Sequence, residues 1–169
     1  FRNTLRNIQY YHDIGVIGFL GQVSGKNWGP NGLHYYMVSK SLWNPDLDVE
    51  AVFEDYCEKG FGPAAEDVKG YYGTYWNAVK TKNVPIKRSP DAGGWSIFES
   101  AIDIYTPDVL IKARAYLDKA FLLAKDRPDI IKRLNLLEVS QSYAEKFIPF
   151  ASAHRQWRRN PSDQGAREQ

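Results

Sequence analysis

The feature that most constrains the fold is a continuous apolar run from Ile14 to Val23, with the sequence IGVIGFLGQV. β-Branched and aromatic residues without polar alternation are typical of a β-strand that is buried on both faces. A lone strand of this kind leaves its backbone N–H and C=O groups without partners. Because no other segment has comparable strand character, we expect the neighbouring strands to lie in additional chain. The sequence is therefore interpreted as a portion of a larger protein.

Most of the remaining sequence predicts amphipathic helices, because apolar residues recur every three or four positions. Asn44-Pro45 should end one helix, Asp46 or Asp48 should cap the next, and Gly60 should stop it. An aromatic stripe follows, which includes Tyr72 and Trp76. The predicted fold class is mainly α, with a helical bundle or appendage that follows one strand.

The second half predicts a long loop and then a helical hairpin. Residues 82–105 contain prolines and glycines, which indicate a loop of the kind that often carries function. Thr106-Pro107 then begins a helix. The helix after it should place six residues inward: Ile131, Leu134, Leu137, Tyr143, Phe147 and Phe150. Pro149 should kink or end that last helix.

Charge excludes several classes of partner. The 169 residues include 22 basic and 20 acidic side chains, so the formal net charge is only +2. A field this weak predicts no nucleic-acid partner, and arginines near the C-terminal helix end suit the helix dipole. No apolar run approaches the roughly 20 residues that span a bilayer, so no membrane partner is expected. The lone Cys57 excludes an internal disulfide.

The sequence predicts neither a catalytic pair nor a metal site. A glycosidase needs two carboxyl groups on either side of one bond, and the acids around Asp48 are explained by helix capping. Glu99 and Asp103 are weaker candidates, because nothing in the sequence fixes their geometry. The three histidines lie far apart without a ligand at metal-binding spacing. We therefore expect no metal, no cofactor and no catalytic residue within this chain.

The segment that follows the apolar run has the chemistry of a sugar-binding site. Gln22 and Asn27 offer amides for hydrogen bonds to hydroxyls, and Trp28 offers a flat face to the C–H side of a sugar. The ends of barrel strands are where barrel enzymes build their sites. Trp95, in the long loop, has similar chemistry. An ordinary loop with Trp28 as a core anchor is the alternative.

The order of residues from Gly32 to Ala65, GLHYYMVSKSLWNPDLDVEAVFEDYCEKGFGPAA, resembles a known family. It is similar to bacterial glycoside-hydrolase-like proteins that carry domain of unknown function 4838. The pattern extends over roughly residues 14–80, and its WNPD stretch resembles the stop that follows the last barrel helix of some glycosidases.

The resemblance implies a place for each part of the chain. Residues 1–45 would be the end of a truncated (β/α)8-like barrel, and residues 46–169 a C-terminal helical region that packs on the missing barrel portion. The chain would then act within a glycoside hydrolase, with an oligosaccharide or polysaccharide as partner, in a secreted or periplasmic protein. A non-catalytic helical module that binds carbohydrate or protein, through the stripe around Tyr72 and Trp76, is the alternative.

Overall fold

The protein is mainly helical. The computed structural model describes residues 2–21, 28–82, 88–89, 94–95 and 97–159. Its elements are α1 (Arg2–Asp13), α2 (Trp28–Trp43), α3 (Val49–Phe61), the short 3-10 helix η1 (Gly62–Ala64), α4 (Ala65–Lys82), β1 (Arg88–Ser89), β2 (Gly94–Trp95), α5 (Ile97–Ile104), α6 (Pro107–Leu123) and α7 (Pro128–Arg159). The two strands, each of two residues, pair antiparallel.

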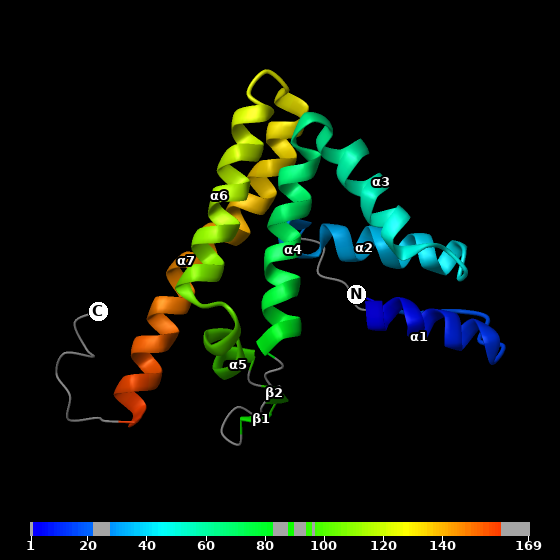
Figure 1. Ribbon diagram of the computed structural model, residues 1–169. Helices are drawn as coiled ribbons and strands as arrows, with labels where there is room; N and C mark the ends of the chain where they lie inside the picture. Colours follow the sequence, from blue (N-terminus) through cyan, green and yellow to red (C-terminus); the bar gives the residue numbers. More distant parts are fainter. Residues whose placement is uncertain (1, 22–27, 83–87, 90–93, 96, 160–169) are drawn as a thin grey trace.

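Helices α4, α6 and α7 run side by side as a bundle, and α1, α2 and α3 extend to one side of it (Figure 1). Gly70 of α4 allows α4 and α6 to approach closely, because a Cβ there would lie only 2.4 Å from the ring of Tyr116. Helix α2 meets the bundle at its first turn, where it packs against α7. The bundle is therefore the platform on which α2 and α3 are mounted.

One apolar core joins all the large helices. Its buried side chains come from α1 to α4, α6 and α7, and include Leu5, Met37, Phe53, Val68, Leu117 and Leu134. Residues from both sides of position 45 thus share a single cluster. Tyr72 is buried in it, and Trp76 packs against it beside Phe53, with ring centroids 4.7 Å apart. The aromatic stripe of α4 consequently serves mainly core packing, with Tyr72 buried and Trp76 partly buried.

A polar network crosses the bundle. The fully buried Gln141 of α7 donates to the carbonyl of Leu110 at 3.1 Å and accepts from the hydroxyl of Tyr75. Arg114 of α6 forms ion pairs with two carboxylates of α7, those of Glu138 and Glu145. Buried polar groups are tolerated when they are hydrogen-bonded, so these contacts fix the register of α4, α6 and α7.

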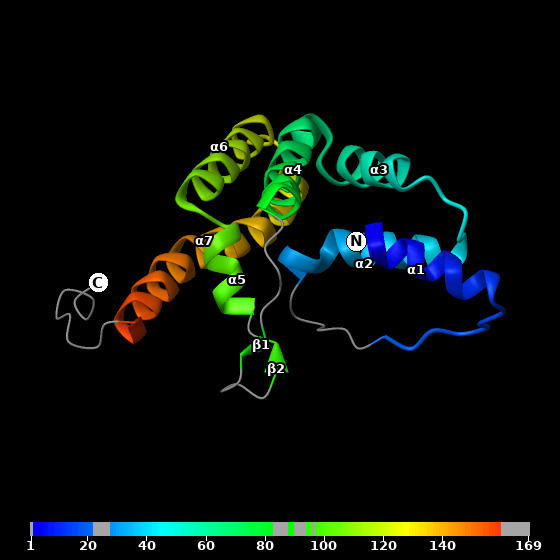
Figure 2. The ribbon, with the colours of Figure 1, turned by 60° about the horizontal axis from the view of Figure 1, so that its bottom comes forward.

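The predicted buried strand is not formed. Within residues 14–21, which the structure describes, the backbone pairs with no neighbouring strand and every side chain is exposed. Ile17 and Leu20 are as open to solvent as in an extended peptide, at 105% and 99%. The segment runs along the outer edge of α1 and α2 (Figure 2).

The difference follows from the lack of a partner sheet. Among the described residues the strands are β1 and β2, and this two-residue pair is too short to receive a further strand. The prediction also included Gln22 and Val23, which lie outside the described residues.

Several local predictions are confirmed. Helix α2 ends directly before Asn44, and the carboxylate of Asp48 accepts hydrogen bonds from the backbone N–H groups of Glu50 and Ala51. Thr106 is the N-cap of α6, with Pro107 in the first turn. Helices α6 and α7 form the predicted hairpin.

Other local predictions are wrong. Helix α3 continues through Gly60, and it is Gly62 that takes the positive φ, at 47°. The expected loop at 82–105 contains the helix α5, whose Ala101 packs against Leu110 and Ile148. Helix α7 does not end at Pro149 but runs on to Arg159, with the proline on the exposed side; the alternative, a kink at Pro149, stays a prediction.

The inward face of α7 agrees with the prediction in part. Leu134 and Leu137 are buried as predicted, whereas Tyr143 and Phe150 are exposed. The buried residues of the second half of the helix are Leu137, Gln141, Ile148 and Ala151. The buried positions follow one another at intervals of three, four and seven, as on one face of a helix. Gln141 lies at the centre of that face. A prediction based on apolar residues alone omits it, and so it placed Tyr143 and Phe150 inward instead.

Arg114→Met should lower the free energy of unfolding by about 2 kcal/mol at about pH 7, because two part-buried carboxylates lose their partner. Hydrogen bonds from Arg114 lower the pKa of both Glu138 and Glu145 below the ordinary 4.5. The stabilisation by Arg114 is therefore fully present above the ordinary carboxyl pKa of 4.5 and is lost as the pH falls through the lower pKa of the folded protein.

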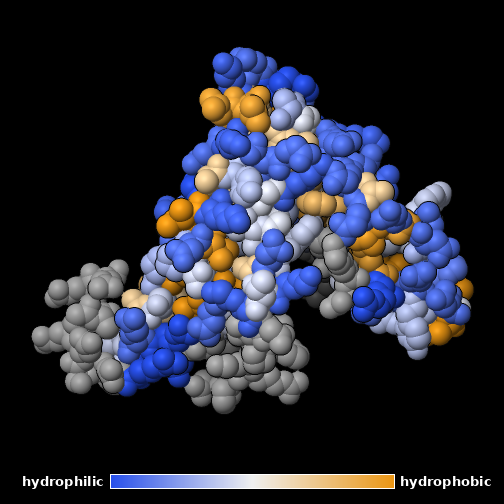
Figure 3. Space-filling view, viewed as in Figure 1, coloured by the Kyte–Doolittle hydropathy of each residue, from blue (hydrophilic) through white to orange (hydrophobic). Residues whose placement is uncertain are grey.

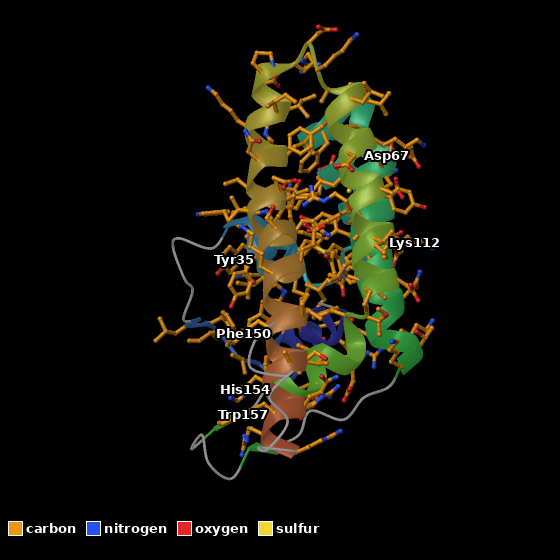
Figure 4. The ribbon with its side chains drawn as sticks, turned by 90° about the vertical axis from the view of Figure 1, so that its left-hand side faces the viewer. Tyr35, Asp67, Lys112, Phe150, His154 and Trp157 are labelled. Carbon is orange, nitrogen blue, oxygen red and sulfur yellow. The ribbon has the colours of Figure 1, made fainter. Side chains whose placement is uncertain are left out.

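Urea unfolding of wild type and variant across this pH range measures the effect, and the two stabilities should converge on acidification. Lys112→Met is the matched control, since Lys112 also lies on α6 but points away from α7 (Figure 4). A difference that persists unchanged in acid would contradict the assignment.

Candidate functional site

A groove opens where α2, α3 and α7 meet, and we name it the Trp28 groove. It has a volume of about 440 Å³. Aromatic and aliphatic side chains form its walls, and charged groups lie among them; the lining residues are Trp28, Gly32, Tyr36, Asp55, Tyr56, Lys59, Gly60, Phe61, Arg133, Leu136 and Leu137. Such a mixture, mostly apolar with a few polar groups, is typical of small-molecule sites.

Trp28 is placed by close contact between two helix backbones. It is the first residue of α2, and the next residue, Gly29, packs against α7 so tightly that a Cβ would lie 2.1 Å from the carbonyl oxygen of Leu136. Only glycine permits this approach. The contact sets the indole of Trp28 beside Leu136 at the mouth of the groove.

Three residues of α2 share one face along the groove, because Trp28, Gly32 and Tyr36 follow at intervals of four. Gly32 keeps the space between two aromatic groups open: a Cβ there would lie 3.3 Å from the hydroxyl of Tyr56 and 3.9 Å from the ring of Trp28. The ring of Tyr36 lies 5.3 Å from that of Tyr56. The groove is thus walled by aromatic rings.

The carboxylate of Asp55 is the centre of the polar side of the groove. Tyr36 donates its hydroxyl proton to Asp55 at 2.6 Å, and Lys59 forms an ion pair with the same carboxylate from one turn further along α3. The hydrogen bonds from Lys59 and Tyr36 lower the pKa of Asp55, so that it is ionised at neutral pH. The bond to Asp55 in turn raises the pKa of Tyr36 to about 12.

Helix α7 supplies a second cation. Arg133 donates to the carbonyl oxygen of Gly60 at 3.0 Å, near the end of α3, and lies 3.5 Å from Asp129 on its own helix. This bond ties α3 to α7 on the side of the groove opposite α2. Leu136 and Leu137 provide the apolar surface between these groups.

Of the four predicted sugar-binding residues, the structure places one side chain. Trp28 is 53% exposed, so it is not the buried core anchor of the alternative interpretation. Gln22 and Asn27 lie outside the described residues, as does the side chain of Trp95, whose backbone forms β2.

Sequence reasoning missed the partners of Trp28. Tyr36, Asp55 and Arg133 come from three helices, and their meeting depends on how those helices cross. The spacing of Trp28, Gly32 and Tyr36 at intervals of four on α2 was the one signal that could have linked them.

The weaker acidic candidates have structural partners. Asp103 forms an ion pair with Arg155 at 2.7 Å. Glu54, one of the acids around Asp48, pairs with Lys69. The side chain of Glu99 lies outside the described residues. Among the side chains that the structure places, no group of three or more His, Cys, Asp or Glu could hold a metal ion. Likewise, no helix in this part of the chain is long and apolar enough to cross a membrane.

The fold defines a mainly helical protein with an exposed apolar segment and an aromatic groove. Residues 2–73 match the sequence model of a family described as Domain of unknown function (DUF4838). No curated protein and no solved structure matches the chain. The match includes the α2 and α3 walls of the Trp28 groove, whereas Arg133 and Leu136 lie beyond it. The match over residues 2–73 confirms the resemblance to domain of unknown function 4838.

Gly29→Ala should destabilise the protein by about 1–3 kcal/mol, because the added methyl group overlaps backbone atoms of α7 that cannot move independently. It should also shift the emission of Trp28. Gly73→Ala is the control: a Cβ at this position in α4 meets nothing within 4 Å, and replacing a helical glycine adds roughly 0.5–1 kcal/mol.

Thermal and urea unfolding, with tryptophan fluorescence, measure both variants. Equal stability of the two variants would contradict the close contact between α2 and α7.

Proposed function

We propose that this chain is the helical C-terminal region of a glycoside-hydrolase-like protein, in which it braces the catalytic domain and contributes an edge of the glycan site. The observation that carries the proposal is the exposed apolar segment at residues 14–21. Hydrophobic residues gather on the side of the molecule where α1 and α2 lie (Figure 3). Exposed apolar patches of this kind mark surfaces that bind other protein.

The segment has the properties of a strand that lacks its sheet. It is non-helical, it is apolar on both faces, and Ile17 through Gly21 form no backbone hydrogen bonds with the described elements. A shallow cavity of about 230 Å³ lies between it and α1, lined by Ile8, Tyr11 and Phe19 among others. A parallel sheet would cover both faces of such a strand. In this proposal the sheet belongs to the barrel-like domain that the family resemblance implies.

The proposal assigns the chemistry of bond cleavage to residues outside this chain. The acids Asp48, Glu54 and Asp103 are engaged in capping or ion pairs, which supports a bracing role for this region. A secreted or periplasmic location follows from the resemblance alone and stays a prediction.

A second candidate is a non-catalytic module that binds carbohydrate or protein. The observation that favours it is an aromatic row on α7, where the exposed Phe150 and His154 are followed by the partly buried Trp157 (Figure 4). Phe150 is 65% exposed. Hydrolysis of a glycan by the intact protein, and its loss on removal of residues 1–169, would favour the first candidate.

The variant Ile17→Asn distinguishes a buried strand from a solvent-exposed segment at residues 17–21. In this chain alone the variant should unfold at the same temperature as wild type, because Ile17 contacts solvent. In the intact protein that contains the barrel-like domain, the same change should cost about 2–4 kcal/mol, since it buries an amide in an apolar sheet.

Asp13→Asn, an exposed polar change next to the segment, is the control and should have no effect in either form. Tolerance of Ile17→Asn in the intact protein would overturn the proposed strand.

A further inference from the structure

We infer that the Trp28 groove binds one pyranose unit of an uncharged glycan, with the ring stacked on Trp28 and its hydroxyls bonded to the polar side of the groove. The choice of ligand rests on the proposed role in glycan processing. The residues that make the site are Trp28, Tyr36, Asp55, Lys59 and Arg133.

The indole of Trp28 is held ready for stacking. Tyr35 contacts it edge to face, with ring centroids 5.4 Å apart and planes at 83°. The backbone contact between Gly29 and Leu136 of α7 fixes the first turn of α2, to which Trp28 belongs. A ring that is already fixed loses little entropy when it binds, and its open face can cover the apolar C–H side of a sugar.

The charged groups of the groove have partners within the protein. Lys59 forms an ion pair with Asp55, and Arg133 lies 3.5 Å from Asp129, which also pairs with Arg127. The groove nevertheless presents acceptors on the carboxylate and donors on the ammonium and guanidinium groups. Sugar hydroxyls both donate and accept, and so they match a mixed set of this kind.

The size and chemistry of the groove exclude other ligands. A volume of about 440 Å³ suits a small molecule and not a folded partner. An apolar helix would desolvate the ion pair of Asp55 and Lys59 without replacing its hydrogen bonds, at a net cost. A phosphate would meet the carboxylate of Asp55, which its partners keep ionised.

Titration of this chain with cellohexaose, xylohexaose, mannohexaose and chitohexaose, followed by tryptophan fluorescence and saturation-transfer NMR, tests the site. We expect at least one hexasaccharide to bind. Trp28→Ala should weaken that binding about tenfold, which corresponds to about 1.4 kcal/mol and to the order of one stacking contact. Tyr36→Phe, which removes a single hydroxyl, should weaken it by a few fold and guards against a folding defect.

Trp43→Ala is the matched control, because Trp43 ends the same helix, is 92% exposed and lies outside the groove. It should bind as wild type does. Failure of wild type to bind any of the four sugars, or equal loss in the Trp28 and Trp43 variants, would overturn the site. Ile17→Asn should leave sugar binding unchanged, so failure of the strand proposal and failure of this site give different results.

Discussion

The arrangement of the whole molecule depends on the contact of α7 with α4 and α6, and a buried amide stands at its centre. Gln141 bonds to the backbone of α6 and to Tyr75 of α4, while Arg114 draws two carboxylates of α7 towards α6. Because a buried polar group without partners is costly, only one register of the three helices satisfies all of these bonds. That register fixes where Leu136 and Arg133 lie, and hence where α2 and α3 can pack to form the groove.

Local signals in the sequence predicted the helices well. The cap at Asp48 and the start at Thr106-Pro107 depend on neighbouring residues alone, and both are confirmed. The inward face of α7 was predicted correctly at Leu134 and Leu137 and wrongly at Tyr143 and Phe150, because the central residue of that face is Gln141, whose burial depends on partners from other helices. The stop at Gly60 was wrong because the helix continues to Phe61 and Gly62 takes the positive φ.

The sequence pointed to Trp28 by its chemistry and by its position after the apolar run, and the interval of four links Tyr36 to it on α2. Trp28 is exposed, and its role in binding stays a prediction. Its partners Asp55 and Arg133 lie far away in the sequence and meet it through the crossing of α2, α3 and α7. No local pattern predicts such a crossing. The composition of the apolar run indicates a strand, yet the described residues offer it no sheet to join.

The helical bundle carries an exposed apolar segment and an aromatic groove. We propose that residues 17–21 of this segment belong in a sheet of a larger intact protein. Hydrogen exchange of their backbone amides tests this claim most directly. In this chain alone these amides should exchange about as fast as in an unfolded peptide, whereas amides of α4, α6 and α7 are protected. In the intact protein they should become as strongly protected as the bundle. Fast exchange of residues 17–21 in the intact protein would contradict the claim.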